Sequence, residues 1–475
     1  MQIMKHIVHI LGVVCGLMLL TTACSDKDEA GSISWNQKAL FMHWGEEATV
    51  SFSGFNISSY SIASVPEGWD TPKIDAQSLT ATIVAPAEDS GAAATGTIRL
   101  RGLTTGSEYI HSSLYVALNA LEVDYTAQPA NCYIANKPNA YYRFDAMRKG
   151  NGEPIATARV AVIWQTSMNL VQYLTFNNGE CAFYIKAEDD DATKPKRGNA
   201  LLGAYDSADN LLWSWHVWMT DMDVEGEVIT NGEYELMGRQ LGALACANDT
   251  PQEILDSYGV YYQLGRKDPF AGPSTYTASK GTTISLFDAE SNTVTYQYPA
   301  SSSETGNYSY ANSHPTHFIT TEHKNENWCR EMTNNVQGWN DTQKSVNDPC
   351  PYGWRVAPAA AFAGLTIADD LTVEDAATRY ASSYGWQLTN GSASHFWFAA
   401  GRRIYLDGKI ENLYNDTLVR NIATEAQPWV GYLWASEGTI FTYWFNKANP
   451  ATSGVRNDYQ LGGANGLSVR CVREK

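Results

Sequence analysis

Short segments in which apolar and polar residues alternate recur through the first part of this 475-residue chain, and they restrict the folds open to it. The segments ATVSFSGF, SLTATIVAPA, GTIRLRGL and SSLYVALNA alternate with the period of two that half-buried strands have. Gly, Pro, Asn and Ser clusters separate them, and no long helical pattern intervenes. This pattern predicts an immunoglobulin-like β-sandwich over residues 32–120.

A second immunoglobulin-like β-sandwich module is expected over residues 121–225. Its predicted strands contain RVAVIW, LVQYLTF, CAFYIKA, NALLGAYD and NLLWSWHVWMT, and the sequence YDSADNLLW indicates a hairpin between the last two. In the final strand, Trp213 and Trp215 share one face, while His216 and Trp218 share the other. We interpret these aromatic residues as core, with a ligand platform as the alternative.

Helix signals enter the sequence after residue 226. Thr250, Pro251 and Glu253 form a capping box with a proline at the first helical position, and Gly259 gives a stop. A second helix is predicted over residues 372–385, where apolar residues keep helical spacing. The segment 300–314 is typical of a loop. Residues 226–475 are therefore expected to form an α+β domain in a mostly β protein.

The charge balance excludes one class of partner. The chain carries 51 acidic and 33 basic residues, for a formal net charge of -18. Such an excess repels phosphate backbones and anionic lipid head groups. We therefore expect no nucleic-acid partner.

The first residues predict export. Lys5 precedes a short apolar run, which is typical of a signal peptide over residues 1–23. The sequence LTTAC resembles a bacterial lipobox, which implies lipid attachment at Cys24, a tether over residues 24–31 and an outer-membrane, cell-surface location. The acidic SDKDE resembles the export signal of Bacteroidetes surface lipoproteins. Cleavage by ordinary signal peptidase is the alternative. Membrane contact is expected through the lipid alone.

Two motifs resemble a known family. DPCPYGWRVAP at 348–358 and NGLSVRCVRE at 465–474 resemble the two ends of the Fibrobacter succinogenes major paralogous domain, found in Bacteroidetes lipoproteins and fimbrial tip-like proteins. The resemblance implies a C-type-lectin-like fold over residues 226–475 and a disulfide between Cys350 and Cys471. Leu264 departs from it, because relatives have Trp there. The pairing of Cys132, Cys181, Cys246 and Cys329 stays open.

Three sets of residues imitate metal sites, and we expect none of them to bind metal. Trp339-Asn340-Asp341 matches a calcium-binding strand of sugar-binding lectins in its letters, but it precedes Cys350, whereas the lectin motif lies late in the domain. The acidic residues at 221–225 imitate an EF-hand start without its twelfth-position acid. His314, His317 and His323, with Glu322, fit no common zinc spacing. No metal and no cofactor is predicted.

Enzyme motifs are also missing from the sequence. It contains no GxSxG elbow, HExxH helix, P-loop or GxGxxG after a strand. Paired carboxylates for glycoside cleavage leave no spacing signature, so that alternative stays open. We expect no catalytic residues and no enzymatic activity.

The expected function is calcium-independent binding of a glycan or a protein by an adhesin, either free-standing or in contact with pilin subunits. The alternative is glycan capture for a polysaccharide-utilisation system, and a host or bacterial surface protein is the alternative partner. The ligand-facing residues are expected, by position, in two loops of the aromatic-rich segment 386–466. The predicted residues are Arg402, Arg403, Tyr405, Asp407, Asn446, Asn449, Arg456, Asn457 and Tyr459.

Overall fold

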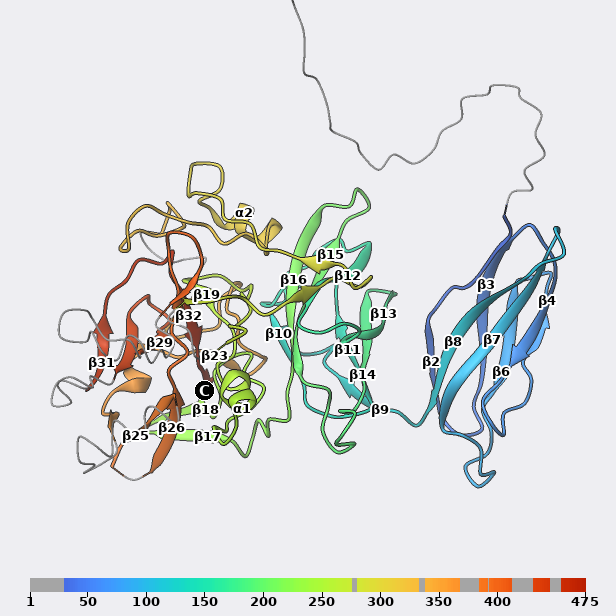
Figure 1. Ribbon diagram of the computed structural model, residues 1–475, viewed down its shortest axis with the longest axis horizontal. Helices are drawn as coiled ribbons and strands as arrows, with labels where there is room; N and C mark the ends of the chain where they lie inside the picture. Colours follow the sequence, from blue (N-terminus) through green and yellow to red (C-terminus); the bar gives the residue numbers. More distant parts are fainter. Residues whose placement is uncertain are drawn as a thin grey trace, which may run out of the picture. The chain divides into compact units, whose positions relative to one another are not determined.

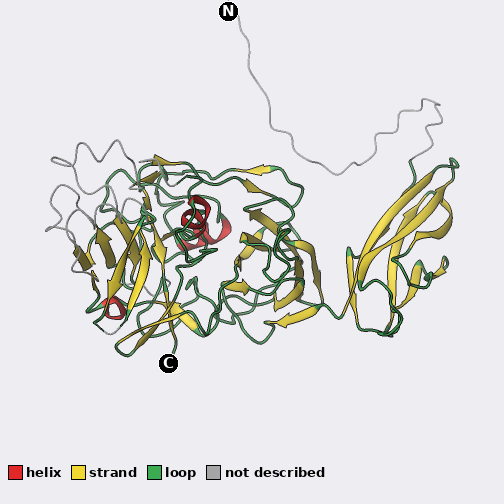
Figure 2. Ribbon diagram, turned by 60° about the horizontal axis from the view of Figure 1, so that its bottom comes forward, coloured by secondary structure: helices red, strands yellow, loops and turns green. Residues whose placement is uncertain are grey.

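The protein is mostly β, as the alternation predicts. The computed structural model describes residues 30–275, 280–332, 338–367, 384–391, 393–411, 430–444 and 454–475. The chain divides into two compact units, unit 1 (residues 1–116) and unit 2 (residues 117–475). Strands follow one another through both units in Figure 1, and the helices in Figure 2 are short. Cys24 and the predicted signal peptide lie outside the described residues.

Unit 1 contains two four-stranded sheets whose apolar faces meet. In β3 and β7 every second residue is buried over part of the strand, including Val50, Phe52, Ile98 and Leu100. Phe52 of one sheet contacts Tyr60 of the other, with ring centroids 5.0 Å apart. All four strands predicted from alternation are confirmed. The sheets are β1 (Ser32–Trp35), β3 (Glu47–Phe55), β6 (Thr80–Val84) and β5 (Lys73–Asp75), and β2 (Ala39–Met42), β8 (Tyr109–Leu118), β7 (Thr95–Thr104) and β4 (Ile57–Ser64).

Unit 2 begins with a six-stranded and a four-stranded sheet. Phe144 of the smaller sheet contacts Trp215 of the larger, with ring centroids 4.9 Å apart. The predicted hairpin is confirmed, and Trp213, Trp215, His216 and Trp218 are all buried in it. The larger sheet is β10 (Cys132–Ala135), β16 (Leu211–Met219), β15 (Gly198–Tyr205), β12 (Arg159–Gln165), β21 (Leu286–Phe287) and β22 (Thr293–Val294). The smaller is β13 (Gln172–Asn177), β14 (Glu180–Ile185), β11 (Ala140–Asp145) and β9 (Leu121–Asp124).

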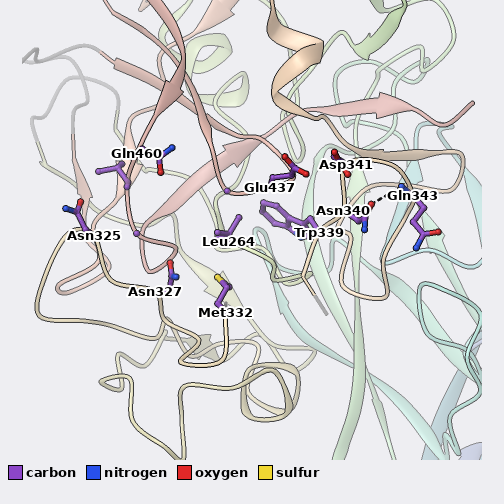
Figure 3. A pocket seen from close by; sticks show the side chains of 13 residues that line it. Leu264, Asn325, Asn327, Met332, Trp339, Asn340, Asp341, Gln343, Glu437 and Gln460 are labelled. Atoms are coloured by element: carbon purple, nitrogen blue, oxygen red, sulfur yellow. Dashed lines mark hydrogen bonds between the residues drawn. The ribbon is translucent and has the colours of Figure 1, made fainter. Parts of the chain in front are cut away.

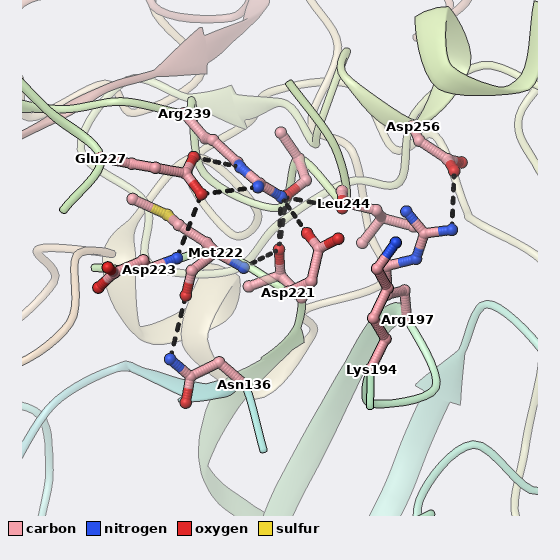
Figure 4. A network of polar contacts seen from close by, with 12 residues as sticks. Asn136, Lys194, Arg197, Asp221, Met222, Asp223, Glu227, Arg239, Leu244 and Asp256 are labelled. Carbon is pink, nitrogen blue, oxygen red and sulfur yellow. Dashed lines mark hydrogen bonds and ion pairs between the residues drawn. The ribbon is translucent and has the colours of Figure 1, made fainter. Parts of the chain in front are cut away.

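Packing is continuous across residues 225 and 226, where the sequence suggests a domain boundary. Strands β21 and β22 extend the six-stranded sheet, and Trp218 shares a core with Met237 and Val260. Arg239 also ties the two segments together (Figure 4): its guanidinium donates to both Glu227 carboxylate oxygens at 2.8 Å and to Asp221 at 2.7 Å. The expected division at 225 is therefore replaced by one compact unit, because two-residue strands some 60 residues later carry no alternation signal.

Three further sheets build the rest of unit 2. The largest has eight strands, and its core strands β29, β30 and β32 are buried almost throughout. It contains β20 (Lys280–Gly281), β28 (Ile410–Glu411), β27 (Arg402–Arg403), β32 (Gly466–Val469), β29 (Val430–Trp434), β30 (Ile440–Trp444), β31 (Gly454–Tyr459) and β19 (Tyr262–Gln263). The others are β17 (Val228–Asn231), β18 (Tyr234–Met237), β33 (Cys471–Arg473) and β23 (Trp354–Val356), and β24 (Thr366–Ile367), β25 (Gly385–Thr389) and β26 (Ser394–Phe398).

The disulfide implied by the family resemblance is confirmed. Cys350 and Cys471 are bonded across a sequence separation of 121 residues, and both are buried. Strand β33, which holds Cys471, pairs with β23 just after Cys350 and with β18. The bond therefore joins the two motifs at adjacent strands. Cys132, Cys181, Cys246 and Cys329 are free thiols.

Helices are short in the described part of the chain. The predicted capping box is confirmed at α1 (Pro251–Asp256), where Thr250 accepts from the Glu253 amide, and the helix ends before Gly259. The segment expected to be a loop contains α2 (Tyr308–Ser313), because Asn307 caps its first turn. A short 3-10 helix, η1 (Ala359–Phe362), follows β23. The helix predicted over 372–385 falls mainly outside the described residues. No described helix has the length and apolar character that a membrane span requires.

Candidate ligand-binding site

A polar cavity of about 710 Å³, here called the central cavity, opens among four loops of unit 2. The loops are the segment after α2, the segment around Trp339, the turn between β29 and β30, and the connection from β31 to β32. These loops come together because β29, β30 and β32 lie in one sheet and β19 pairs with β32. The volume is within the range usual for small-molecule sites.

Amide side chains dominate the wall of the central cavity (Figure 3). Asn325, Gln343 and Gln460 are exposed, and their side-chain amides make no hydrogen bond to any described residue. Asn327 and Asn340 also line it, with their oxygens engaged by the amides of Gly463 and Thr342. A primary amide has two donor protons and an acceptor oxygen. Three uncommitted amides are therefore available to a ligand with many hydroxyl or amide groups.

Apolar side chains form the fixed part of the wall. Trp339 is 1% exposed, and its indole N–H donates to the carbonyls of Arg266 and Asn347. Leu264 lies beside it, held by strand β19 and by the bond from the Trp328 indole to the Leu264 carbonyl at 2.8 Å. These contacts fix the floor, so the exposed amides project from a rigid base.

Two carboxyl groups face each other at the edge of the central cavity. A side-chain hydrogen bond to Asp341 raises the pKa of Glu437, and burial and the negative charge of Asp341 raise it further. A neighbouring carboxylate disfavours the charged form of Glu437, because like charges repel. The pair adds two acidic groups to the edge of the central cavity.

Replacing Glu437 by Gln should make the protein slightly more stable at neutral pH. A raised carboxyl pKa means that the folded state binds the proton more tightly, so stability falls as pH rises through that pKa. Because Glu437 is mainly exposed, we expect E437Q to gain about 0.5 kcal/mol or less at pH 7 and nothing below about pH 4. Urea unfolding at both pH values measures this. A loss of stability at pH 7 would contradict it.

The predicted Arg402–Asp407 loop is corrected at Arg403. Arg403 is 1% exposed, and its guanidinium donates to the carbonyls of Gly408 and Ala271 and to the Thr283 hydroxyl. Such a side chain holds the core and is closed to ligand. Arg402 and Tyr405 are partly exposed, and Asp407 pairs with Lys409 at 2.5 Å. None of these residues lines the central cavity.

The second predicted loop is described only in part. Asn446 and Asn449 lie outside the described residues. Arg456, Asn457 and Tyr459 lie on β31, which pairs with β30. Arg456 and Asn457 are exposed, and Arg456 binds Asp458 at 3.0 Å. These residues end just before Gln460, which does line the central cavity.

The imitations of metal sites have other partners. Arg239 forms ion pairs with the carboxylates of Asp221 and Glu227. His314 stacks on Tyr310 with ring centroids 4.1 Å apart, and His317 lies 2.8 Å from the Tyr310 hydroxyl. Within the described ranges, no three His, Cys, Asp or Glu side chains come together in a way that could hold a metal ion. Trp339-Asn340-Asp341 lies in the wall of the central cavity, where it supplies one buried ring and two polar groups.

A buried Cys-His-Asn arrangement resembles catalytic machinery but is closed to substrate. His216 Nδ1 lies 3.5 Å from Cys132 Sγ, and His216 Nε2 lies 2.8 Å from Asn199 Oδ1. Burial raises the pKa of the Cys132 thiol and lowers the pKa of His216 to about 3. Both groups are therefore neutral at physiological pH, which gives an inert thiol and no reactive thiolate.

Comparisons with known proteins add no information about the site. No family model and no curated protein matches the chain. An endo-fucoidan hydrolase of glycoside hydrolase family 107 is 12% identical over 44% of this chain and 31% of its own, with a TM-score of 0.16. The D00-D0 domain of intimin is 12% identical over 39% of this chain and 96% of its own, with a TM-score of 0.14. SporoSAG of Toxoplasma gondii is 11% identical over 39% of this chain and 97% of its own, with a TM-score of 0.13. TM-scores this low carry no argument about fold or function.

Proposed function

We propose that this protein is a non-enzymatic adhesin that binds a glycan at the central cavity without calcium. The observation that carries the proposal is the set of uncommitted amides, Asn325, Gln343 and Gln460, above a rigid apolar floor. Sugar hydroxyls both donate and accept hydrogen bonds, which amides match directly. Leu264, which is 7% exposed, offers a small apolar contact to a sugar ring, and buried Trp339 supports it from beneath. Direct amide contacts need no bridging metal.

The wider proposal places this binding at a cell surface. It combines lipid attachment at Cys24, an immunoglobulin-like unit 1 and a C-type-lectin-like fold in the later part of unit 2. It rests on the leader sequence and on the two end motifs joined by the Cys350–Cys471 disulfide. The same binding site could serve in two ways. The protein could assemble with pilin subunits, or it could capture glycans for a polysaccharide-uptake system.

Glycan binding should weaken when the free amides are removed. The protein from residue 25 onward is screened on a glycan array and titrated calorimetrically with the best binder, with and without EDTA. Each of N325A, Q343A and Q460A removes hydrogen bonds worth about 0.5–1.5 kcal/mol, so we expect affinity to fall about 2- to 10-fold. EDTA should leave affinity unchanged.

The matched control is Gln77→Ala, which removes an exposed amide from unit 1, far along the chain from the cavity residues. It should bind as the parent protein does. If no glycan on the array binds, the proposal is overturned. If binding is lost in EDTA, the proposed calcium independence is overturned.

A further inference from the structure

The central cavity adjoins two further cavities. It shares Asn340 and Gln343 with a cavity of about 460 Å³, and it shares Asn327 and Met332 with another of about 700 Å³. Among the described residues the two outer cavities have no lining residue in common. The central cavity therefore lies between two others, and it adjoins each of them through two shared wall residues.

Building on the proposed function, we infer that the three cavities form one groove, which binds a linear, neutral polysaccharide along its chain, with the central cavity as the middle of three subsites. A site for a terminal sugar needs one closed pocket. A groove open at both ends of its middle subsite accepts an internal stretch of a polymer. All three cavities are within the ~300–1,000 Å³ usual for sites that hold a drug-sized ligand, so each has room for about one or two sugar units.

Charge in the groove favours a neutral chain. No Lys or Arg is among the described residues of the central cavity, where Asp341 and Glu437 turn toward each other. In the 460 Å³ cavity, Lys149 pairs with Glu153 at 3.0 Å. Lys344 there donates to the carbonyls of Cys350 and Trp354 at 2.7 Å. The 700 Å³ cavity holds Arg330 together with Glu322 and Glu326. Acidic side chains therefore outnumber basic ones along the three cavities, which disfavours a sulfated or carboxylated sugar.

The walls of the outer subsites are also held in place. Buried Arg266 donates to the His317 carbonyl at 2.7 Å and to the Ala311 carbonyl at 3.3 Å, which anchors helix α2. Asn312 of this helix lines the 460 Å³ cavity. Ser301 of the 700 Å³ cavity donates to the Trp328 carbonyl at 2.8 Å. The groove therefore exists before a ligand arrives.

The test uses chain-length series of malto-, cello- and xylo-oligosaccharides from one to eight sugars, with heparin and polygalacturonate as anionic chains and oligolysine as a basic peptide. We expect affinity to rise at least about tenfold from the disaccharide to the hexasaccharide of the series that binds, then to level off. The anionic chains and oligolysine should not bind.

Two variants test the outer subsites separately. Asn312→Ala alters one end of the groove and favours the helix it lies in, and Glu322→Ala alters the exposed far end. Each should weaken hexasaccharide binding at least about threefold and leave disaccharide binding unchanged. Q460A, in the central cavity, should weaken both.

The outcomes separate this inference from the proposed function. Equal affinity for disaccharide and hexasaccharide, or equal effects of N312A and E322A on both, would overturn the extended groove and leave glycan binding intact. Tighter binding of an anionic chain or of oligolysine would overturn the inference that the ligand is a neutral polysaccharide. Failure of every series to bind would overturn both proposals.

Discussion

Removal of the Cys350–Cys471 disulfide is expected to lower the free energy of unfolding of unit 2 by about 5 kcal/mol. The bond closes a segment of 121 residues, and the chain-entropy cost of such a loop in the unfolded state gives that value. It also joins β23 to β33 at a buried position. Urea unfolding of the C350A/C471A variant, followed by tryptophan fluorescence, measures the loss. Only three of the 15 tryptophans lie in unit 1, so the signal reports mainly on unit 2.

Reduction of the unaltered protein provides a second way to open the bond and should give a similar loss. The control is Cys246→Ala, which removes an exposed free thiol and should leave the unfolding curve in place. If C350A/C471A and the reduced protein unfold at the same urea concentration as the oxidised parent, the expected role of the disulfide is contradicted.

Lys267→Met is expected to cost about 3–5 kcal/mol, because it leaves a buried carboxylate without its cation. Lys267 is fully buried, and its ammonium binds Asp268 at 2.6 Å and the Ser214 hydroxyl. Asp268 is 1% exposed and would retain only the bond from Ser214 among its described side-chain partners. The same unfolding experiment measures the loss.

The double variant K267M/D268N should be more stable than K267M, because it removes the stranded charge. Lys149→Met is the matched control: both lysines lie over the Trp213 ring, at 5.5 Å for Lys149 and 4.5 Å for Lys267, but Lys149 is partly exposed. We expect K149M to cost less than about 1 kcal/mol. Equal losses for K149M and K267M would contradict the importance of the buried pair.

Strand positions could be predicted from the sequence wherever one face is buried and the other is wet. Strand β7 is an example, with Ile98 and Leu100 inward and Arg99 outward. Strands of two residues, such as β21 and β22, give no such pattern, and they are what extends the six-stranded sheet past residue 225. The sequence therefore predicts the β class and most long strands but not how the segments of unit 2 combine.

Arg402 and Arg403 show why the orientation of candidate site residues is harder to predict than the strands that hold them. Neighbouring residues of a strand point to opposite faces, so one of the two had to point inward. Which one depends on how β27 pairs with β28 and β32, and that pairing is set by residues far along the chain. Arg403 points inward and its guanidinium binds main-chain carbonyls, a role that its sequence neighbours do not reveal.

The central cavity had almost no signal in the sequence. Its free amides Asn325, Gln343 and Gln460 come from three loops, and isolated Asn and Gln residues in loops are common. Trp339-Asn340-Asp341 lies in the wall of the cavity, but its match to a calcium motif does not predict a binding site there. The sequence of one loop does not show which other loops will lie beside it. Here the order of β29, β30 and β32 in the sheet brings the loops together.

The late strands β32 and β33 also fix which unit can fold first. The two sheets of unit 1 have all their strands within residues 32–118, so they need nothing from the rest of the chain. Unit 2 needs residues 466–473, because β32 and β33 pair with strands as early as β18 and β19. Until those residues are in place, Trp218 lacks its core neighbours Leu467 and Val469. A chain cut short before β32 should therefore keep a folded unit 1 and expose the core of unit 2, which makes it prone to aggregation.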